Sequence, residues 1–211
     1  MKRINTFIKA AKYIIQYFYK MVLRAFGIGV KRDLFLNEKF YLLKNFYGAT
    51  CLDVGCGYAN FTNFLISEDI ETTGLDIVDE SKHKDVPFFK FNGLHIPFED
   101  QSFDTSIIMF TLHHADDQDA ILNEVIRVTR KTIIIAEDVI ETPFDRILAN
   151  FHLETSVWSK GTDSFHSNKR WQDIFKQKNL HLEAVLPIPR YREPLYPVAR
   201  CVYALSIVRK K

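Results

Sequence analysis

The chain has 211 residues, 47% of them apolar, which is enough for one domain with a substantial hydrophobic core. Its three cysteines, Cys51, Cys56 and Cys201, are too few and too scattered for a disulfide framework or a zinc site, and they indicate reduced thiols in a cytoplasmic protein. The net charge is only +2, but residues 1–32 carry eight Lys or Arg and no acid, residues 190–211 carry six and one acid, and the body between them is acidic.

The first 32 residues predict a basic amphipathic helix. Apolar side chains recur from Ile4 to Phe26 at spacings of three and four, and lysines fall on the opposite face. Charged residues interrupt every apolar run, so we expect neither a signal peptide nor a membrane span. Two interpretations stay open: the helix lies on an anionic membrane surface as a peripheral contact, or it caps the domain over the substrate entrance.

Residues 33–211 predict a single α/β domain. A helix is expected at about 33–46, after which short β-branched strands alternate with helices, as in a parallel sheet with crossover helices. We expect strands at 50–54, 71–77, 87–91, 103–110, 132–138, 181–187 and 199–208, and helices at 59–67, 117–129 and 168–178. A looser segment, 140–166, interrupts the alternation.

The loop after the first predicted strand is the most informative stretch. Asp53 ends the strand, Gly55 and Gly57 follow, and a helix begins at once, which is the arrangement that brings backbone close to a ligand. A dinucleotide fingerprint would require a third glycine, where this chain has Asn60. Because a carboxylate at Asp53 repels a pyrophosphate but suits an ammonium and a sulfonium, the loop favours S-adenosylmethionine over a nicotinamide nucleotide.

The run 52–57, LDVGCG, resembles the first motif of class I S-adenosylmethionine-dependent methyltransferases, in particular the group that includes the ubiquinone and menaquinone enzymes. Later passages at 74–77, 91–104, 107–116 and 165–171 resemble further motifs of that family in the same order, so the resemblance covers about 49–188. It implies a doubly wound, Rossmann-like sheet of seven mostly parallel strands, with an antiparallel last strand inserted next to the fifth.

The resemblance also implies how the cofactor is held. Asp76, followed by Ile77, ends the second strand, where an acid can accept both ribose hydroxyls. Asn92 and Gly93 take the place of the family's adenine-binding Asp and its neighbour, and the Asn92 amide still offers an acceptor oxygen. Phe110 ends the fourth strand, which in the family faces the methionine part of the cofactor.

Methyl transfer is an in-line displacement in which positioning can supply most of the rate, and a base, if one acts, is most often histidine. His113 and His114 follow the fourth strand, at the edge where open α/β sheets bind ligands. His114 is the candidate base; the alternative is a helix-entry histidine bonded to backbone. Asp138 ends the fifth strand, where it either orients the substrate or caps a loop.

Segment 140–166 breaks the alternation beside this edge, which favours a lid over the substrate, although an ordinary packed insertion is the alternative. Its substrate-side candidates are His152, Trp158 and His166. No spacing of His, Cys and carboxylate predicts a metal site.

These features predict methyl transfer from S-adenosylmethionine to an O, N or C atom of a small-molecule or lipid-like acceptor. Two rival functions remain, a nicotinamide-dependent oxidoreductase and a binding protein that keeps the fold without turnover. No nucleic-acid partner is expected, because the body of the domain is acidic. We expect a cytoplasmic protein, in contact with membrane if residues 1–32 bind there.

Overall fold

The computed structural model of the chain describes residues 38, 40–155, 164–188 and 198–209. The helix expected at 1–32 and the lid candidate Trp158 therefore lie outside the described residues. The side chain of His152 is likewise not described. Among the described helices, none is long and apolar enough to cross a bilayer.

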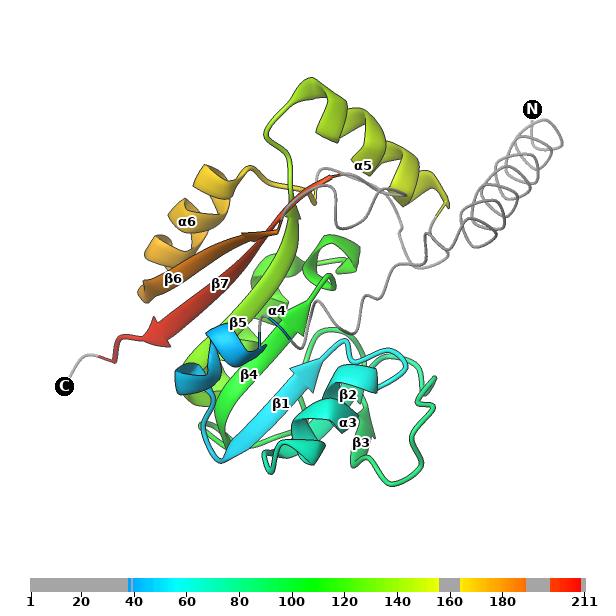
Figure 1. Cartoon of the computed structure of the whole chain (residues 1–211), viewed down its shortest axis with the longest axis vertical. Helices are drawn as coiled ribbons and strands as arrows, with labels where there is room; N and C mark the ends of the chain where they lie inside the picture. The colour runs from blue at the N-terminus through cyan, green and yellow to red at the C-terminus, as the bar shows by residue number, and fades with distance from the viewer. Residues whose placement is uncertain (1–37, 39, 156–163, 189–197, 210–211) are drawn as a thin grey trace, which may run out of the picture.

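One sheet of seven strands organises the molecule, in the order β3-β2-β1-β4-β5-β7-β6 (Figure 1). The strands are β1 (Thr50–Val54), β2 (Glu71–Asp76), β3 (Phe88–Lys90), β4 (Phe103–Met109), β5 (Thr129–Val139), β6 (Leu180–Ile188) and β7 (Ala199–Ile207). All neighbouring strands pair in parallel except β7, which is antiparallel to both β5 and β6. The predicted fold, including the last strand beside the fifth, is confirmed.

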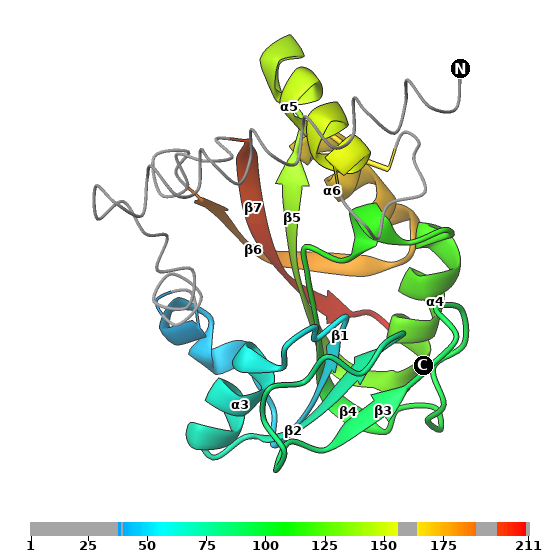
Figure 2. The ribbon, with the colours of Figure 1, turned by 90° about the vertical axis from the view of Figure 1, so that its right-hand side faces the viewer.

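Helices cover both faces of this sheet, as a doubly wound fold requires. Figure 2 shows α3 (Asn60–Ser67) and the segment around residues 40–46 on one face, with α4 (Gln118–Val128) and α6 (Asn168–Gln177) on the other. Side-chain caps fix where two of these helices begin. The Asp117 carboxylate accepts from the Ala120 N–H at 2.9 Å, and the Ser167 hydroxyl accepts from the Arg170 N–H at 3.2 Å.

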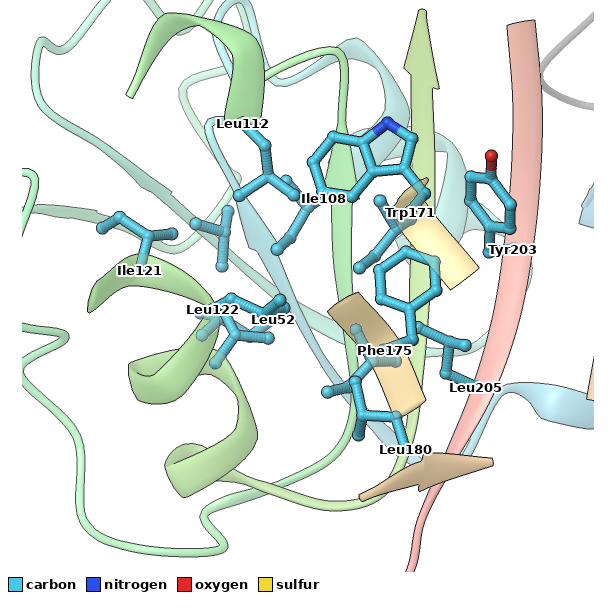
Figure 3. Close-up of a cluster of buried hydrophobic side chains, with 14 of the residues drawn as sticks. Leu52, Ile108, Leu112, Ile121, Leu122, Trp171, Phe175, Leu180, Tyr203 and Leu205 are labelled. Atoms are coloured by element: carbon cyan, nitrogen blue, oxygen red, sulfur yellow. The ribbon is translucent and has the colours of Figure 1, made fainter. Parts of the chain in front are cut away.

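The larger of two apolar cores lies between the sheet and α4 and α6. Trp171 and Phe175, one turn apart on α6, stack with ring centroids 5.7 Å apart, and Phe175 meets the edge of Tyr203 on β7 (Figure 3). Leu122 on α4 and Leu52 on β1 extend the same cluster. The second core packs the other face against α3 and residues 40–43. Both cores hold the strand ends that carry the candidate site.

The prediction of a looser segment at 140–166 is wrong in part, because α5 (Pro143–Thr155) lies within it. The sequence does contain a signature of this helix: Phe144, Ile147 and Leu148 recur at helical spacing behind a Thr142 cap. The Asp145 carboxylate, fully buried, accepts from the Thr142 N–H and hydroxyl, both at 2.9 Å. In Figure 1, α5 stands beyond the carboxyl end of β5.

Two smaller departures involve helix ends. Within the expected helix 33–46, the described part is helical at 40–42 and then tightens to a 3₁₀ turn at Lys44–Phe46. The strand β5 begins at Thr129, three residues before its predicted start, because Thr129 leaves α4 with an extended backbone.

Candidate active site

The glycine loop follows β1 at the carboxyl edge of the sheet. The N–H groups of Gly55 and Cys56 donate to the carbonyl of Leu75 on β2, at 2.7 and 3.2 Å. Gly55 has φ +73°, and a Cβ there would lie 2.3 Å from the Thr111 side chain. Gly57 has φ +54°, but a Cβ there would meet nothing within 4 Å. The first glycine therefore permits close packing, whereas the second leaves open space beside the loop.

Asp76, at the end of β2, faces this loop. Its Oδ2 accepts a hydrogen bond from the Gly57 N–H at 2.8 Å, and its Oδ1 accepts from the Ile77 N–H at 2.7 Å. The side chain is partly exposed. The structure thus brings together the two residues that sequence reasoning assigned to loop and ribose, beside the open space at Gly57.

Asp53 lies beneath the loop. It is 2% exposed, and its Oδ2 accepts from the Thr62 hydroxyl on α3 at 2.7 Å. Burial raises the pKa of Asp53 to about 6, the Thr62 hydrogen bond opposes that rise, and the charge of Asp76 adds to it. A carboxylate buried to this extent offers almost no oxygen surface to a ligand in the loop.

Asn92 does not offer the free acceptor oxygen that the sequence suggested. Its Oδ1 accepts from the backbone N–H groups of Leu94 and His95, at 2.9 and 2.8 Å, which occupies both lone pairs. The amide NH₂ is the group that remains to contact a ligand. Beside it, Gly93 has φ +81°, and a Cβ there would lie 3.4 Å from the Ile77 side chain.

Apolar side chains flank this position on the protein surface. Ile77 is 42% exposed and Leu94 is 49% exposed, each next to a predicted cofactor residue. Two exposed aliphatic side chains close to a polar loop are suited to cover the faces of a planar base.

The exit of β4 begins with a strained residue. β4 ends at Met109, one residue before the predicted end, because Phe110 turns to φ +54°, a conformation rare for a side chain of this size. Its N–H still donates to the Ala136 carbonyl on β5 at 2.7 Å, and the Arg200 guanidinium lies 5.1 Å from its ring centroid. These contacts hold Phe110 at the edge of the sheet. The next residue, Thr111, contacts Gly55 of the glycine loop.

His113 is buried against a carboxylate that the sequence analysis did not select. Its Nδ1 lies 2.6 Å from Oε2 of Glu137 on β5, and the two side chains are 2% and 0% exposed. Burial disfavours the charged ring, but the charge and hydrogen bond of Glu137 outweigh it, so the pKa of His113 is raised. Glu137 lies in a buried stretch of β5. Its partner His113 comes from the exit of β4, so only the fold shows that the two side chains meet.

His114 is partly buried, and its ring centroid is 4.1 Å from that of His113. Its main-chain N–H donates to the Thr111 carbonyl at 3.0 Å, as part of the 3₁₀ turn Leu112–His114. His166 approaches the same edge, where its Nε2 lies 3.0 Å from Oε1 of Gln118. Three of the four substrate-side or base histidines thus gather at the β4 and β5 ends.

Asp138, predicted to orient the substrate or to cap a loop, pairs with an arginine of β7. Its Oδ1 accepts from the Arg200 Nε at 2.6 Å, and the two side chains are 3% and 8% exposed. A buried ion pair with arginine directs this carboxylate oxygen at its partner. Asp138 therefore joins β5 to β7 through Oδ1, and its role toward the substrate stays a prediction.

The chain is similar to known methyltransferases in sequence and in fold. Residues 52–136 match a family described as "Methyltransferase domain". The chain is 28% identical over 127 residues to an O-methyltransferase of Aspergillus nomiae, covering 52% of this chain and 56% of that relative. It is 26% identical over 173 residues to a demethylmenaquinone methyltransferase of Bacillus cereus, covering 66% of this chain and 73% of that relative.

Among solved structures, a S-adenosylmethionine-dependent methyltransferase of Methanosarcina mazei superposes with a TM-score of 0.64 at 16% identity, covering 80% of this chain and 98% of that one. This likeness establishes the shared fold, and the family match implies S-adenosylmethionine as the cofactor. Residues 52–136 of this chain thus match the methyltransferase domain family, and the fold is the one seen in S-adenosylmethionine-dependent methyltransferases.

Proposed function

We propose that this protein transfers a methyl group from S-adenosylmethionine to a small-molecule or lipid-like acceptor. The observation that carries the proposal is the contact between Asp76 and the glycine loop: a partly exposed carboxylate 2.8 Å from the Gly57 N–H, beside space that no protein atom fills within 4 Å of a Gly57 Cβ. A carboxylate at this edge of an α/β sheet suits a nucleoside ribose.

The residues present fit the cofactor. Asp76 would accept the ribose hydroxyls, the Asn92 NH₂ would donate to a ring nitrogen of adenine, and Ile77 would pack against the base. The Asp53 charge, buried below the loop, would favour the ammonium end. When bound, S-adenosylmethionine supplies an electrophilic methyl group on a sulfonium sulfur.

The acceptor would enter at the β4 and β5 ends. We assign His114 the role of accepting the acceptor's proton, with His113 behind it and His166 at the entrance. Segment 140–166, which includes His152 and Trp158, would cover the acceptor as a lid. Support for the lid comes from its two ends, because the Ile140 N–H donates to the His166 carbonyl at 3.0 Å, so the segment leaves and rejoins the sheet at one point.

The acceptor class rests on the relatives, one named as an O-methyltransferase and one as acting on demethylmenaquinone. A lipid-like acceptor would agree with a cytoplasmic protein whose residues 1–32 contact an anionic membrane. Flotation of the full chain with vesicles that contain phosphatidylglycerol tests this contact, since Lys9, Lys12 and Lys20 changed to Gln should reduce binding. Equal binding to neutral vesicles would contradict it.

The cofactor assignment is tested by calorimetry with S-adenosylhomocysteine and with NAD. Binding of the first alone supports the proposal, whereas binding of NAD alone would favour the oxidoreductase. A transfer assay with labelled methyl groups against a cell extract, followed by identification of the labelled product, then tests turnover. Cofactor binding without any labelled product would favour a binding protein that keeps the fold.

A further inference from the structure

Glu137 collects three hydrogen bonds from three consecutive residues of the β4 exit. Its Oε1 accepts from the N–H groups of Thr111 and Leu112, at 3.1 and 2.8 Å, and its Oε2 lies 2.6 Å from Nδ1 of His113. The side chain is fully buried. Isolated burial of a carboxylate is costly, and these charge-assisted bonds offset the cost.

Because Oε1 of Glu137 is bonded to backbone, Oε2 is the oxygen that faces His113, and this contact determines which ring nitrogen of His113 carries hydrogen. Because a carboxylate only accepts hydrogen bonds, the Nδ1 of His113 must carry the hydrogen, in the neutral and in the charged ring alike. The other charged or titratable groups near this ring are Asp138 on β5, Arg200 on β7 and His114 beside it. The ring plane is held by Phe165, which stacks on it at 4.8 Å.

One of these residues, Thr111, also contacts the glycine loop. The Thr111 N–H donates to Glu137, and the Thr111 hydroxyl, which has one hydrogen to donate, lies 3.4 Å from the Gly55 carbonyl and 3.1 Å from the Met109 carbonyl. Gly55 accommodates Thr111 only because it lacks a Cβ. One buried carboxylate therefore contacts the His113 ring and also holds the backbone of Thr111, whose side chain contacts the glycine loop.

We propose that Glu137 is a positioning residue for methyl transfer: it holds His113, beside His114, with hydrogen on Nδ1, and it holds the Thr111 backbone whose side chain packs on the glycine loop. This inference rests on the proposed function. Beyond that function, the placement of the histidines next to the acceptor would depend on Glu137, a residue that need not touch the acceptor or the cofactor.

The test is Glu137→Gln, which keeps the shape of the side chain. The amide oxygen is expected to stay on the Thr111 and Leu112 N–H groups, which places the NH₂ opposite His113 and requires Nδ1 to become an acceptor. Nitrogen NMR of histidine-labelled protein should then show hydrogen moved from Nδ1 to Nε2 of His113. We expect kcat to fall at least tenfold, with acceptor KM and S-adenosylhomocysteine affinity within about threefold.

The matched control is Asp104→Asn, at the opposite end of the sheet. Asp104 is also a buried carboxylate that accepts a backbone N–H, from Ala49 at 3.1 Å. This variant should lower stability without changing the His113 hydrogen position or kcat. A second variant, His113→Gln, leaves Glu137 in place and should reproduce the loss of kcat. Because this variant lacks the His113 ring, the NMR signal that disappears from its spectrum is the signal of His113.

Failure of the inference is distinct from failure of the proposed function. If the wild-type protein binds no S-adenosylhomocysteine, the proposed function is wrong. If the wild type binds and turns over, but Glu137→Gln keeps full kcat or the Nδ1 hydrogen, the positioning role of Glu137 is wrong. If Glu137→Gln does not fold, full kcat in His113→Gln would equally overturn it.

Discussion

Two aspartates at neighbouring strand ends show how environment separates residues of one type. Asp53 ends its strand in the core beneath the loop and is bonded to Thr62, whereas Asp76 reaches the surface of the loop. Only the second can touch a ligand directly. Replacing Asp76 should therefore change cofactor affinity, whereas replacing Asp53 should change how stability depends on pH.

Asp76→Ala should weaken binding of S-adenosylhomocysteine at least tenfold, or about 1.4 kcal/mol, because charge-assisted bonds to the ribose would be lost. Isothermal calorimetry measures this change. Asp85→Ala, which removes an exposed carboxylate from the loop between β2 and β3, is the matched control and should keep wild-type affinity. Equal affinity in both variants would contradict the ribose assignment.

Asp53→Asn should remove a pH dependence of stability. The folded-state pKa of about 6 lies above the value near 4 in an unfolded chain, so the folded protein binds the extra proton between these values. The free energy of unfolding of the wild type, relative to the variant, should fall by about 2 kcal/mol as pH rises from 4 to 6. Urea unfolding at several pH values checks the slope, and parallel curves would count against a buried Asp53 charge.

Sequence patterns located these side chains but not their partners. Asp53, Asp76 and the two glycines were identified because strand ends and loop spacing are local properties. The engaged oxygen of Asn92, the ion pair of Asp138 and the role of Glu137 were not, because each depends on a side chain or backbone group supplied by another part of the chain.

At the scale of elements, the glycine loop joins a strand, a helix and the β4 exit, and its two glycines serve different contacts. The φ of each is positive, so alanine at either site is strained by about 1–2 kcal/mol. Only at Gly55 does a Cβ also collide with Thr111.

We therefore predict that Gly55→Ala loses clearly more stability than Gly57→Ala, while Gly57→Ala folds and loses cofactor affinity. Thermal unfolding and calorimetry with S-adenosylhomocysteine separate the two effects. A Gly57→Ala variant that binds the cofactor as tightly as the wild type would show that the space beside this residue is not the cofactor site.

At the scale of the whole molecule, β7 lies between β5 and β6 and runs antiparallel to both. Its Arg200 comes from a position 62 residues beyond Asp138, yet the antiparallel register of β5 and β7 sets the two opposite each other. The pair is buried on both sides, so each charge depends on the other.

Arg200→Met should cost roughly 3–5 kcal/mol of unfolding free energy, because Asp138 would be left buried without its main partner. The double variant Asp138→Asn with Arg200→Met should recover part of that loss, since no charge then remains at the site. Guanidinium unfolding of the wild type, both single variants and the double variant measures the coupling. Additive single losses would contradict a coupled buried pair.

The sequence by itself determined the order of strands and helices, the glycine loop and the acid at the end of β2, because periodicity and spacing are encoded within short stretches. The sequence also contains a helical pattern at α5, inside the segment that was expected to be loose. Tertiary structure alone decided which groups meet at the carboxyl edge. Partners such as Glu137 and His113, or Asp138 and Arg200, lie on different strands, and their pairing follows from the strand order and register that pack the two cores.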